Sequence, residues 1–116
     1  MLRPRWKLWL ESEGGDVALS DWRVQLLEAI REHGSLAEAA RRLDVPYKTA
    51  WYKLKEIEAS LGVTLVATSS GGAGHGSAKL TPAAEEAVRR YYAITDGLEA
   101  ELARRFEAAF EKPLPT

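Results

Sequence analysis

Cysteine is absent from the 116 residues of this chain. Its absence excludes disulfides, thiolate nucleophiles and cysteine-ligated zinc, and it is typical of proteins of a reducing cytoplasm. The sequence also lacks any apolar run of about 18 residues, so no membrane-spanning helix is predicted. The basic start of the chain is followed by neither a long apolar stretch nor a small-residue cleavage site. We therefore expect no secretory signal and a cytoplasmic location.

The chain has no excess of either charge, since its formal net charge at pH 7 is −1. The charges are unevenly distributed, however. Residues 46–55 contain Lys48, Lys53 and Lys55 and no acid, whereas residues 82–116 carry more acidic than basic side chains. One basic face on a near-neutral protein is enough to bind phosphate, and we expect such binding to weaken steeply as the salt concentration rises.

Apolar residues make up 46% of the sequence, which is enough for the core of one mainly helical domain. The first elements are short strands. Polar and apolar residues alternate over residues 5–12, and a turn signal follows at Gly14-Gly15-Asp16. Residues 17–19 are apolar and can pair back. Together these segments predict an N-terminal β-hairpin.

Two helices with clear start signals come next. Ser20 offers a side-chain cap for a helix over residues 21–33, and Gly34 is suited to end that helix in a left-handed conformation. Ser35 and Glu38 have the spacing of a capping box, in which each side chain bonds to the other residue's N–H, and they predict the start of a second, alanine-rich helix.

A third helix is predicted over residues 47–60. It follows Pro46, which is acceptable at a helix start because the missing N–H would be unsatisfied there in any case. Apolar residues recur along it at three- and four-residue steps. We expect them to be buried, the indole included: Ala50, Trp51, Leu54, Ile57 and Leu61.

A hairpin is predicted after the third helix. Residues 63–67 and 78–80 are expected strands, and residues 68–77 between them are rich in Gly and Ser. The segment therefore predicts a hairpin with a long tip, and we expect residues 1–81 to form a winged helix-turn-helix domain.

The remaining residues, 82–112, predict a long C-terminal helix that Thr81 caps. Continued to about Glu111, this helix would be roughly 45 Å long, which the preceding body cannot cover. The simplest packing partner for its distal half is the same helix of a second subunit. We expect a homodimer through an apolar stripe formed by Val88, Tyr91, Ile94, Leu98, Leu102 and Phe106.

Residues 34–60 carry the chemistry. A short helix, a tight turn and a helix with basic residues near its start are typical of a helix-turn-helix, whose second helix fits the DNA major groove. Side chains at the start of that helix can reach base edges, while those further along and the Ser35 N–H meet phosphates. The candidate DNA-binding residues of this unit are Ser35, Pro46, Tyr47, Lys48, Thr49, Tyr52, Lys53 and Lys55.

The predicted hairpin supplies the wing. Its tip has no bulky side chains and can lie against the DNA backbone or enter the minor groove. Gly72, Gly74, His75 and Lys79 are the candidate contacts.

Other chemistries lack support. His33 and His75 have no ligand spacing around them, so no metal site is expected. The glycine-rich residues 71–76 lack the Gly-Lys-Ser/Thr ending of a phosphate loop. No carboxylate pair or nucleophile–base set stands out, so we expect no catalytic residues, no cofactor and no enzymatic activity.

The chain resembles the N-terminal DNA-binding domain of ModE-type molybdate-responsive regulators, which is close to the LysR-type winged helix. The resemblance covers residues 6–100 and rests on residues 23–30, 34–40, 47–51, 65–66 and 71–81. It implies a winged-helix dimer, joined through the long helices, whose third helix enters the major groove. Two departures exist. Pro46 stands where the family usually has Ser, and the chain has no room for the family's molybdate-binding domain, so we expect neither an effector domain nor molybdate binding.

Three functions therefore compete. The leading hypothesis is sequence-specific transcription regulation on double-stranded DNA. The second is a protein-interaction module that docks a partner through its long helix and N-terminal Trp6 and Trp9. The third is an architectural DNA binder with weak sequence preference.

Overall fold

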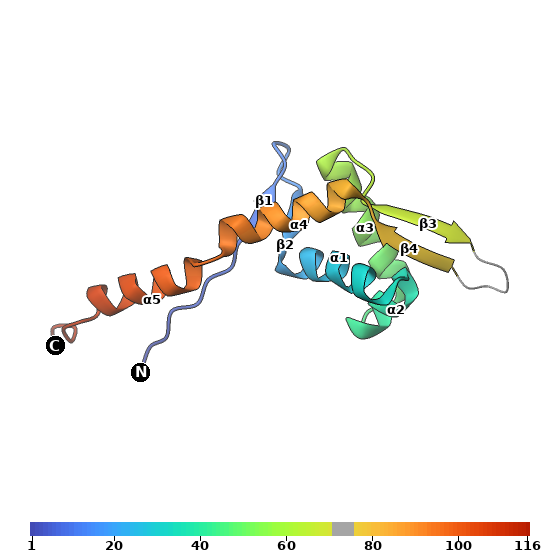
Figure 1. Ribbon diagram of the computed structural model, residues 1–116. Helices are drawn as coiled ribbons and strands as arrows, with labels where there is room; N and C mark the ends of the chain where they lie inside the picture. Colours follow the sequence, from blue (N-terminus) through green and yellow to red (C-terminus); the bar gives the residue numbers. More distant parts are fainter. Residues whose placement is uncertain (71–75) are drawn as a thin grey trace.

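Within the described residues, the chain forms two hairpins and five helices (Figure 1). The computed structural model describes residues 1–70 and 76–116. The mainly helical arrangement, with one hairpin before and one after the three-helix unit, confirms the predicted winged helix-turn-helix fold. In chain order the described elements are β1 (Trp9–Glu11), β2 (Val17–Ser20), α1 (Asp21–His33), α2 (Leu36–Arg42), α3 (Tyr47–Leu61), β3 (Val66–Ser70), β4 (Gly76–Leu80), α4 (Pro82–Thr95) and α5 (Leu98–Ala109).

The N-terminal hairpin is present but shorter than predicted. β1 and β2 pair antiparallel, with Trp9 opposite Ser20. Gly15 takes a φ of 89° in the turn, a conformation that glycine adopts without steric cost. The strand expected over residues 5–12 begins only at Trp9, because β2 gives way directly to α1 and leaves the preceding residues without a partner strand.

The bounds predicted for the first helix, residues 21–33, are confirmed. The Ser20 hydroxyl accepts the Arg23 N–H at 3.3 Å, which satisfies one of the otherwise unpaired N–H groups of α1. Gly34 takes a φ of 73°, and its N–H donates to the Ile30 carbonyl at 2.8 Å. The two ends of α1 thus follow from local chemistry alone.

Only half of the predicted capping box forms at α2. The Ser35 hydroxyl accepts the Glu38 N–H at 3.0 Å. In the described part of the chain, the Glu38 carboxylate makes no bond to the Ser35 N–H and pairs instead with Arg41 and Arg42. These hydrogen bonds, chiefly that from Arg41, lower the pKa of Glu38 to about 2. The two arginines of α2 therefore face solvent already paired.

The core lies where α1, α2, α3 and α4 meet. Ala39, Ala40 and Ala50 are at most 2% exposed, and their small side chains let α2 approach its neighbours closely. The bulkiest fully buried residues come from α1, α3, α4 and the segment before β3: Tyr91, Leu26, Leu27, Ile30, Ile57, Leu65 and Val24.

The prediction that Trp51 is buried was wrong, since it is 40% exposed. Ala50, Leu54 and Ile57 already fill the inward face of α3 at four- and three-residue steps. A helix turns about 100° per residue, so the position after Ala50 points away from that face. Leu61, also expected inside, is half-buried at the end of α3.

The strands of the second hairpin reach further toward its tip than predicted. β3 and β4 pair from Val66 opposite Leu80 to Ser70 opposite Gly76. The expected first strand, residues 63–67, starts late because Thr64 and Leu65 direct their carbonyls to Thr81 at the start of α4. Residues 68–70 and 76–77 of the predicted tip therefore belong to the two strands.

The C-terminal helical segment is present, but it is not continuous. Asp96 leaves the helical region with a ψ of 126°, and Gly97 follows with a φ of 85°. The left-handed conformation at Gly97 ends one helix and begins the next. The predicted 30-residue helix is therefore two helices, α4 and α5.

Three polar contacts and its apolar face hold α4 to α1. The Tyr91 hydroxyl donates to the Asp21 carboxylate at 2.5 Å, and that of Tyr92 donates to Glu28 at 2.7 Å. The bond to Glu28 raises the pKa of Tyr92 to about 12. Arg31 and Glu85 pair at 2.8 Å. α4 is consequently part of the body of the molecule.

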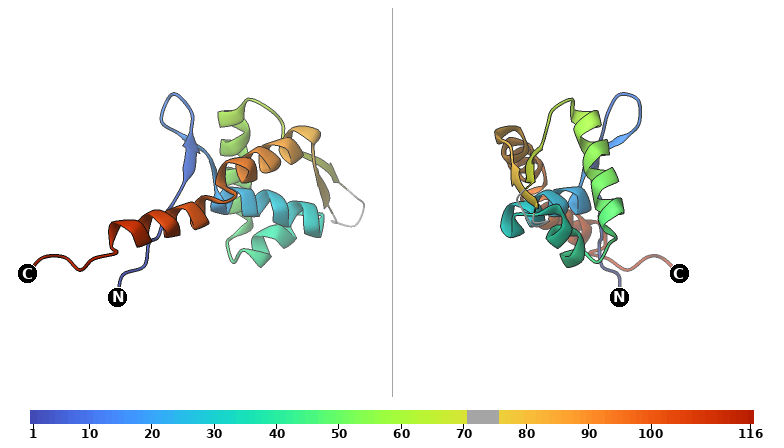
Figure 2. Two further views of the ribbon diagram at one scale, coloured as in Figure 1. Left: turned by 60° about the vertical axis from the view of Figure 1, so that its left-hand side comes forward. Right: turned by 90° about the vertical axis from the view of Figure 1, so that its right-hand side faces the viewer.

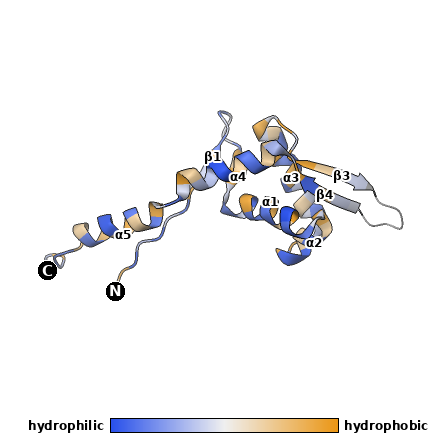
Figure 3. Cartoon of the chain, viewed as in Figure 1, coloured by the Kyte–Doolittle hydropathy of each residue, from blue (hydrophilic) through white to orange (hydrophobic). Residues whose placement is uncertain are grey.

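The segment α5 projects away from that body (Figures 1 and 2). None of its residues is buried, and apolar bands alternate with polar ones along it (Figure 3). The radius of gyration is 18.3 Å, against about 13 Å for a compact domain of this size. In the described ranges, no helix combines the length and apolarity needed to cross a membrane.

Candidate nucleic-acid interface

The turn between α2 and α3 sets the start of α3. Asp44 takes a φ of 57°, and the Val45 N–H returns to the Ala40 carbonyl at 3.0 Å. Pro46 then occupies the cap position in an extended conformation, and α3 has no side-chain cap. The first N–H groups of α3 are thus left for an external acceptor, and the helix dipole favours an anion there.

Aromatic side chains dominate the exposed side of α3. Tyr47, Trp51 and Tyr52 are 55%, 40% and 52% exposed, and the rings of Trp51 and Tyr52 meet edge to face at 5.2 Å. The Lys48 ammonium lies 5.9 Å from the Tyr52 ring centre, and that of Lys55 lies 5.6 Å from the Trp51 ring centre. Each cation is held beside an aromatic face, which is a weak attraction at exposed sites.

The lysines predicted to act together differ in their ion pairs. Lys53 pairs with Glu56 at 3.5 Å and Lys55 pairs with Glu58 at 3.2 Å. Lys48 has no acidic partner within residues 1–70 and 76–116. The acids lie just beyond the acid-free segment, and their spacing of three residues was the available signal for these pairs. Lys48 is thus the cation of α3 that is best placed for a new anionic partner.

Glu56 also draws Lys53 toward the body of the protein. Its carboxylate accepts from Arg23 of α1 at 2.8 Å, and this hydrogen bond is the main reason why the pKa of Glu56 lies below its usual value. The Arg23 side chain is only 10% exposed. Lys53 therefore lies on the side of α3 that faces α1, apart from the other candidates.

A groove of about 500 Å³ joins three of the predicted contacts. Ser35 stands at the start of α2, while Tyr47 and Lys55 extend from α3. The opposite wall is the hairpin β3–β4, with the short side chains of Thr68 and Ser77. The structure thus brings the helix-turn-helix and the hairpin to one concave surface.

Sequence reasoning missed several members of this surface. Trp51 lines the groove although it was expected in the core, and Ala37 lies beside Ser35 at its rim. Hydroxyls of Ser69 and Ser77 hydrogen bond across the hairpin.

The other predicted contacts have varied positions. Pro46 and Lys48 are exposed, Thr49 is half-buried, and Lys79 is exposed on β4. Gly72, Gly74 and His75 lie outside the described residues. Among the predicted dimer contacts, Val88 and Tyr91 are 4% and 1% exposed. They pack into the core of the single chain, so their assignment to a dimer surface was wrong.

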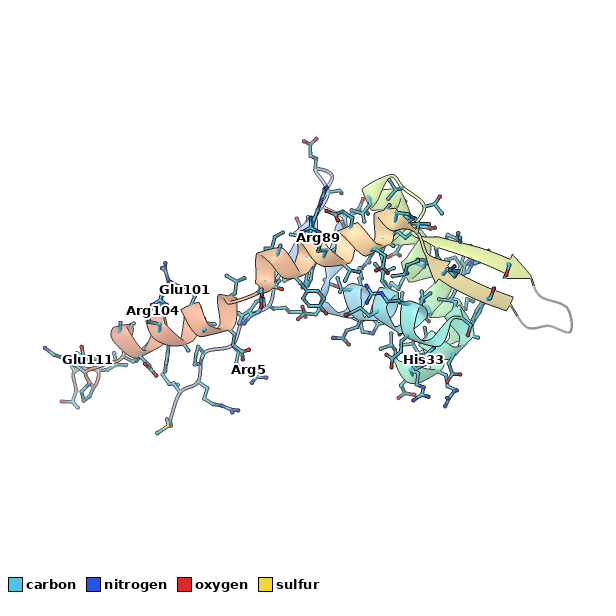
Figure 4. All side chains as sticks on the ribbon, in the orientation of Figure 1. Arg5, His33, Arg89, Glu101, Arg104 and Glu111 are labelled. Carbon is cyan, nitrogen blue, oxygen red and sulfur yellow. The ribbon has the colours of Figure 1, made fainter. Side chains whose placement is uncertain are left out.

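The remaining dimer candidates are accessible. Ile94 is 46% exposed, and Leu98, Leu102 and Phe106 are half-buried along α5. Phe106 stacks on Phe110 at 5.1 Å. Side chains of α5, Glu101 and Arg104 among them, project into open space (Figure 4).

A family model described as bacterial regulatory helix-turn-helix protein, lysR family, matches residues 22–85, which is more than half of the chain. The chain belongs to this family. The match runs from α1 through the start of α4 and so includes the entire groove.

Curated relatives of this lysR-family chain carry molybdenum in their names, as the ModE resemblance predicted. The molybdenum-pterin-binding protein MopB of Rhodobacter capsulatus is 40% identical over 85 residues, which are 73% of this chain and 31% of that protein. The molybdenum transport protein ModE of Azotobacter vinelandii is 34% identical over 90 residues, 78% of this chain and 33% of that protein. The chain thus spans about a third of the length of these relatives.

Solved structures of DNA complexes share the fold. The DNA-binding domain of CbnR in complex with DNA has a TM-score of 0.60 and 27% identity, over 78% of this chain and 98% of that one. Full-length CbnR with its target DNA gives a TM-score of 0.62 and 25% identity, over 78% and 30% of the two chains.

Proposed function

We propose that this lysR-family chain binds double-stranded DNA sequence-specifically and regulates transcription, with α3 in the major groove and the hairpin β3–β4 as a wing on the adjoining backbone. The exposed and uncapped start of α3, opposite the wing, is the observation that carries the proposal. Because regulators of this bacterial family meet their DNA in the cytoplasm, we place the chain there.

The position of each candidate side chain determines whether it would contact base edges or phosphates. Tyr47, Lys48, Thr49 and Tyr52 belong to the half of α3 that would meet base edges. Lys55 and the N–H groups at the starts of α2 and α3 would contact phosphates, which position the protein without reading the sequence. Lys79 would add a phosphate contact from the wing.

We also propose that the protein acts as a homodimer through Ile94, Leu98, Leu102 and Phe106. Ile94 is exposed near the end of α4, and the other three form an apolar stripe on α5, none of whose residues is buried. A second copy related by a two-fold axis would cover the stripe and present two recognition helices to half-sites about 34 Å apart or a multiple of that distance.

Selection from a pool of random duplexes at two salt concentrations tests the proposal. Enrichment of a two-fold symmetric motif, together with affinity that falls as salt rises, is the expected result. Uniform retention would contradict sequence specificity and indicate an architectural binder. No retention at low salt would contradict DNA binding altogether and direct attention to a protein partner.

A point substitution then identifies the reading helix. Lys48→Ala should weaken binding to the selected site about tenfold or more. Lys112→Ala is the matched control, since it also removes one positive charge but lies in the exposed tail. Equal affinity of the Lys48→Ala variant and the control would show that α3 does not read this site.

A further inference from the structure

Glu58 links the third helix to the base of the wing. Its side chain is only 13% exposed, and one carboxylate oxygen accepts the backbone N–H groups of Leu65 at 2.7 Å and Val66 at 3.4 Å. The other oxygen accepts from the Lys55 ammonium at 3.2 Å. One carboxylate thus contacts the start of β3 and a lysine that lines the groove.

The wing has other attachments, but they run to different elements. The Ala78 N–H donates to the Gly34 carbonyl at 2.8 Å, which ties β4 to the turn between α1 and α2. The Thr81 hydroxyl donates to the Thr64 carbonyl at 2.7 Å, which closes the base of the hairpin. Among the hydrogen bonds of residues 1–70 and 76–116, those of Glu58 join a side chain of α3 to β3.

We propose that Glu58 is a positioning residue for DNA binding, holding the wing at a set angle to α3 so that both contact the same duplex; this inference rests on the proposed function. A wing that is held in place before binding loses little conformational freedom on the DNA, so its contacts add to those of α3 in full. A wing released from α3 must be ordered in each binding event, and its contacts then contribute less.

The side chain at position 58 determines how much the wing is expected to contribute to DNA affinity in each variant. The carboxylate supplies one oxygen to the wing and one to Lys55. In Glu58→Gln the amide oxygen can still accept from the wing, but the ion pair with Lys55 is lost and the amide NH2 group is turned toward the ammonium. Glu58→Ala supplies no acceptor. The contribution of the wing to DNA affinity should therefore be largest in the unaltered protein, smaller in the Gln variant and smallest in the Ala variant.

A double-mutant cycle on the selected duplex measures this contribution. In the unaltered protein, Lys79→Ala should weaken binding about fivefold and lower the slope of affinity against salt by about 1. In the Glu58→Ala background, the same substitution should change affinity less than twofold and leave the slope unchanged. Circular dichroism first establishes that each variant is folded; if Glu58→Ala is not, the Gln background serves, with an intermediate effect of Lys79→Ala expected.

Two controls separate positioning from general loss of stability and from failure of the proposed function. Glu56→Ala removes the neighbouring acid, which pairs with Arg23 and Lys53 and makes no hydrogen bond to the described residues of the wing. The effect of Lys79→Ala should stay fivefold in that background. Lys48→Ala should weaken binding equally with and without Glu58. An equal effect of Lys79→Ala in every background would overturn the role of Glu58, whereas no effect of Lys48→Ala anywhere would overturn the proposed mode of DNA binding itself.

Discussion

The helices α4 and α5 are alike in sequence and opposite in environment. They contain 14 and 12 residues, and each carries one glutamate paired with two arginines three and four positions later. In α4 these are Glu86 with Arg89 and Arg90, and in α5 the same pattern starts at Glu101. Yet α4 buries Ala84, Val88 and Tyr91, whereas α5 buries nothing.

The difference shows what local pattern can and cannot decide. Exposed ion pairs add little to stability, and an isolated helix of about 12 residues is marginal in water. Burial of Tyr91 and its neighbours against α1 therefore stabilises α4. Both helices are amphipathic. The apolar face of α4 is buried within the same chain, whereas the apolar face of α5 has no partner among the described residues.

Removal of the buried aromatic of α4 should have the largest effect. Tyr91→Ala leaves a cavity in the core, and we expect a loss of about 3–5 kcal/mol in the free energy of unfolding, measured by urea denaturation. Tyr92→Ala is the control, since this neighbour is 44% exposed and loses mainly its hydrogen bond to Glu28. Comparable losses in the two variants would contradict the assignment of α4 to the body of the protein.

Substitution in the apolar stripe of α5 should act on association instead. Leu102→Ala removes apolar area from both copies at once, so the dimer dissociation constant should rise about tenfold or more in sedimentation equilibrium. Unfolding of the body should be unchanged. Arg104→Ala, on the same helix, should leave association as it is, and a monomeric unaltered protein would refute the dimer.

The break between the helices allows a third test. Nothing lies within 4 Å of a Cβ built on Gly97, so Gly97→Ala meets no steric obstacle apart from its φ of 85°. An alanine there disfavours the left-handed conformation by about 1 kcal/mol and favours the helix. Helicity measured by circular dichroism should rise as α4 and α5 merge. No rise would show that contacts elsewhere maintain the break.

Acidification should produce the smallest effect. Hydrogen bonds from Arg89 and Arg90 lower the pKa of Glu86 to about 2, and those from Arg105 and Arg104 lower that of Glu101. A lowered pKa in the folded state means that the pairs stabilise above the ordinary value of 4.5 and lose this effect as the pH falls toward about 2. Helicity at low salt should decline slightly over that range. Glu86→Gln and Glu101→Gln should each reduce the decline, and an identical titration in both variants would contradict the role of these pairs.

The ends of α1 and the existence of the two hairpins could be predicted from residues that are close together in the sequence. The hydroxyl of Ser20 and the left-handed glycine at position 34 act within one turn of their helix, so a single sequence is sufficient to place them. The candidate DNA contacts on α3 were likewise predictable, because a helix-turn-helix determines which helix end is exposed.

The errors share a different cause. Trp51 belongs to the apolar stripe as a pattern, but the facing helices accommodate only Ala50, Leu54 and Ile57. Val88 and Tyr91 belong to a continuous stripe in the sequence, but α4 buries them in the body, whereas none of the stripe residues on α5 is buried. In both cases, burial depended on which element packs against the helix. The periodicity of apolar residues in the sequence does not contain that information.

By itself, the sequence determined the order of the elements, their caps and the basic character of α3, because these depend on interactions between residues a few positions apart. Only the tertiary structure decided that Trp51 is exposed, that Glu58 spans from α3 to the wing, and that α4 is packed against the body while α5 is open. Those features depend on contacts between residues that are far apart along the chain. Such contacts are determined by the packing of the whole core and not by neighbouring residues.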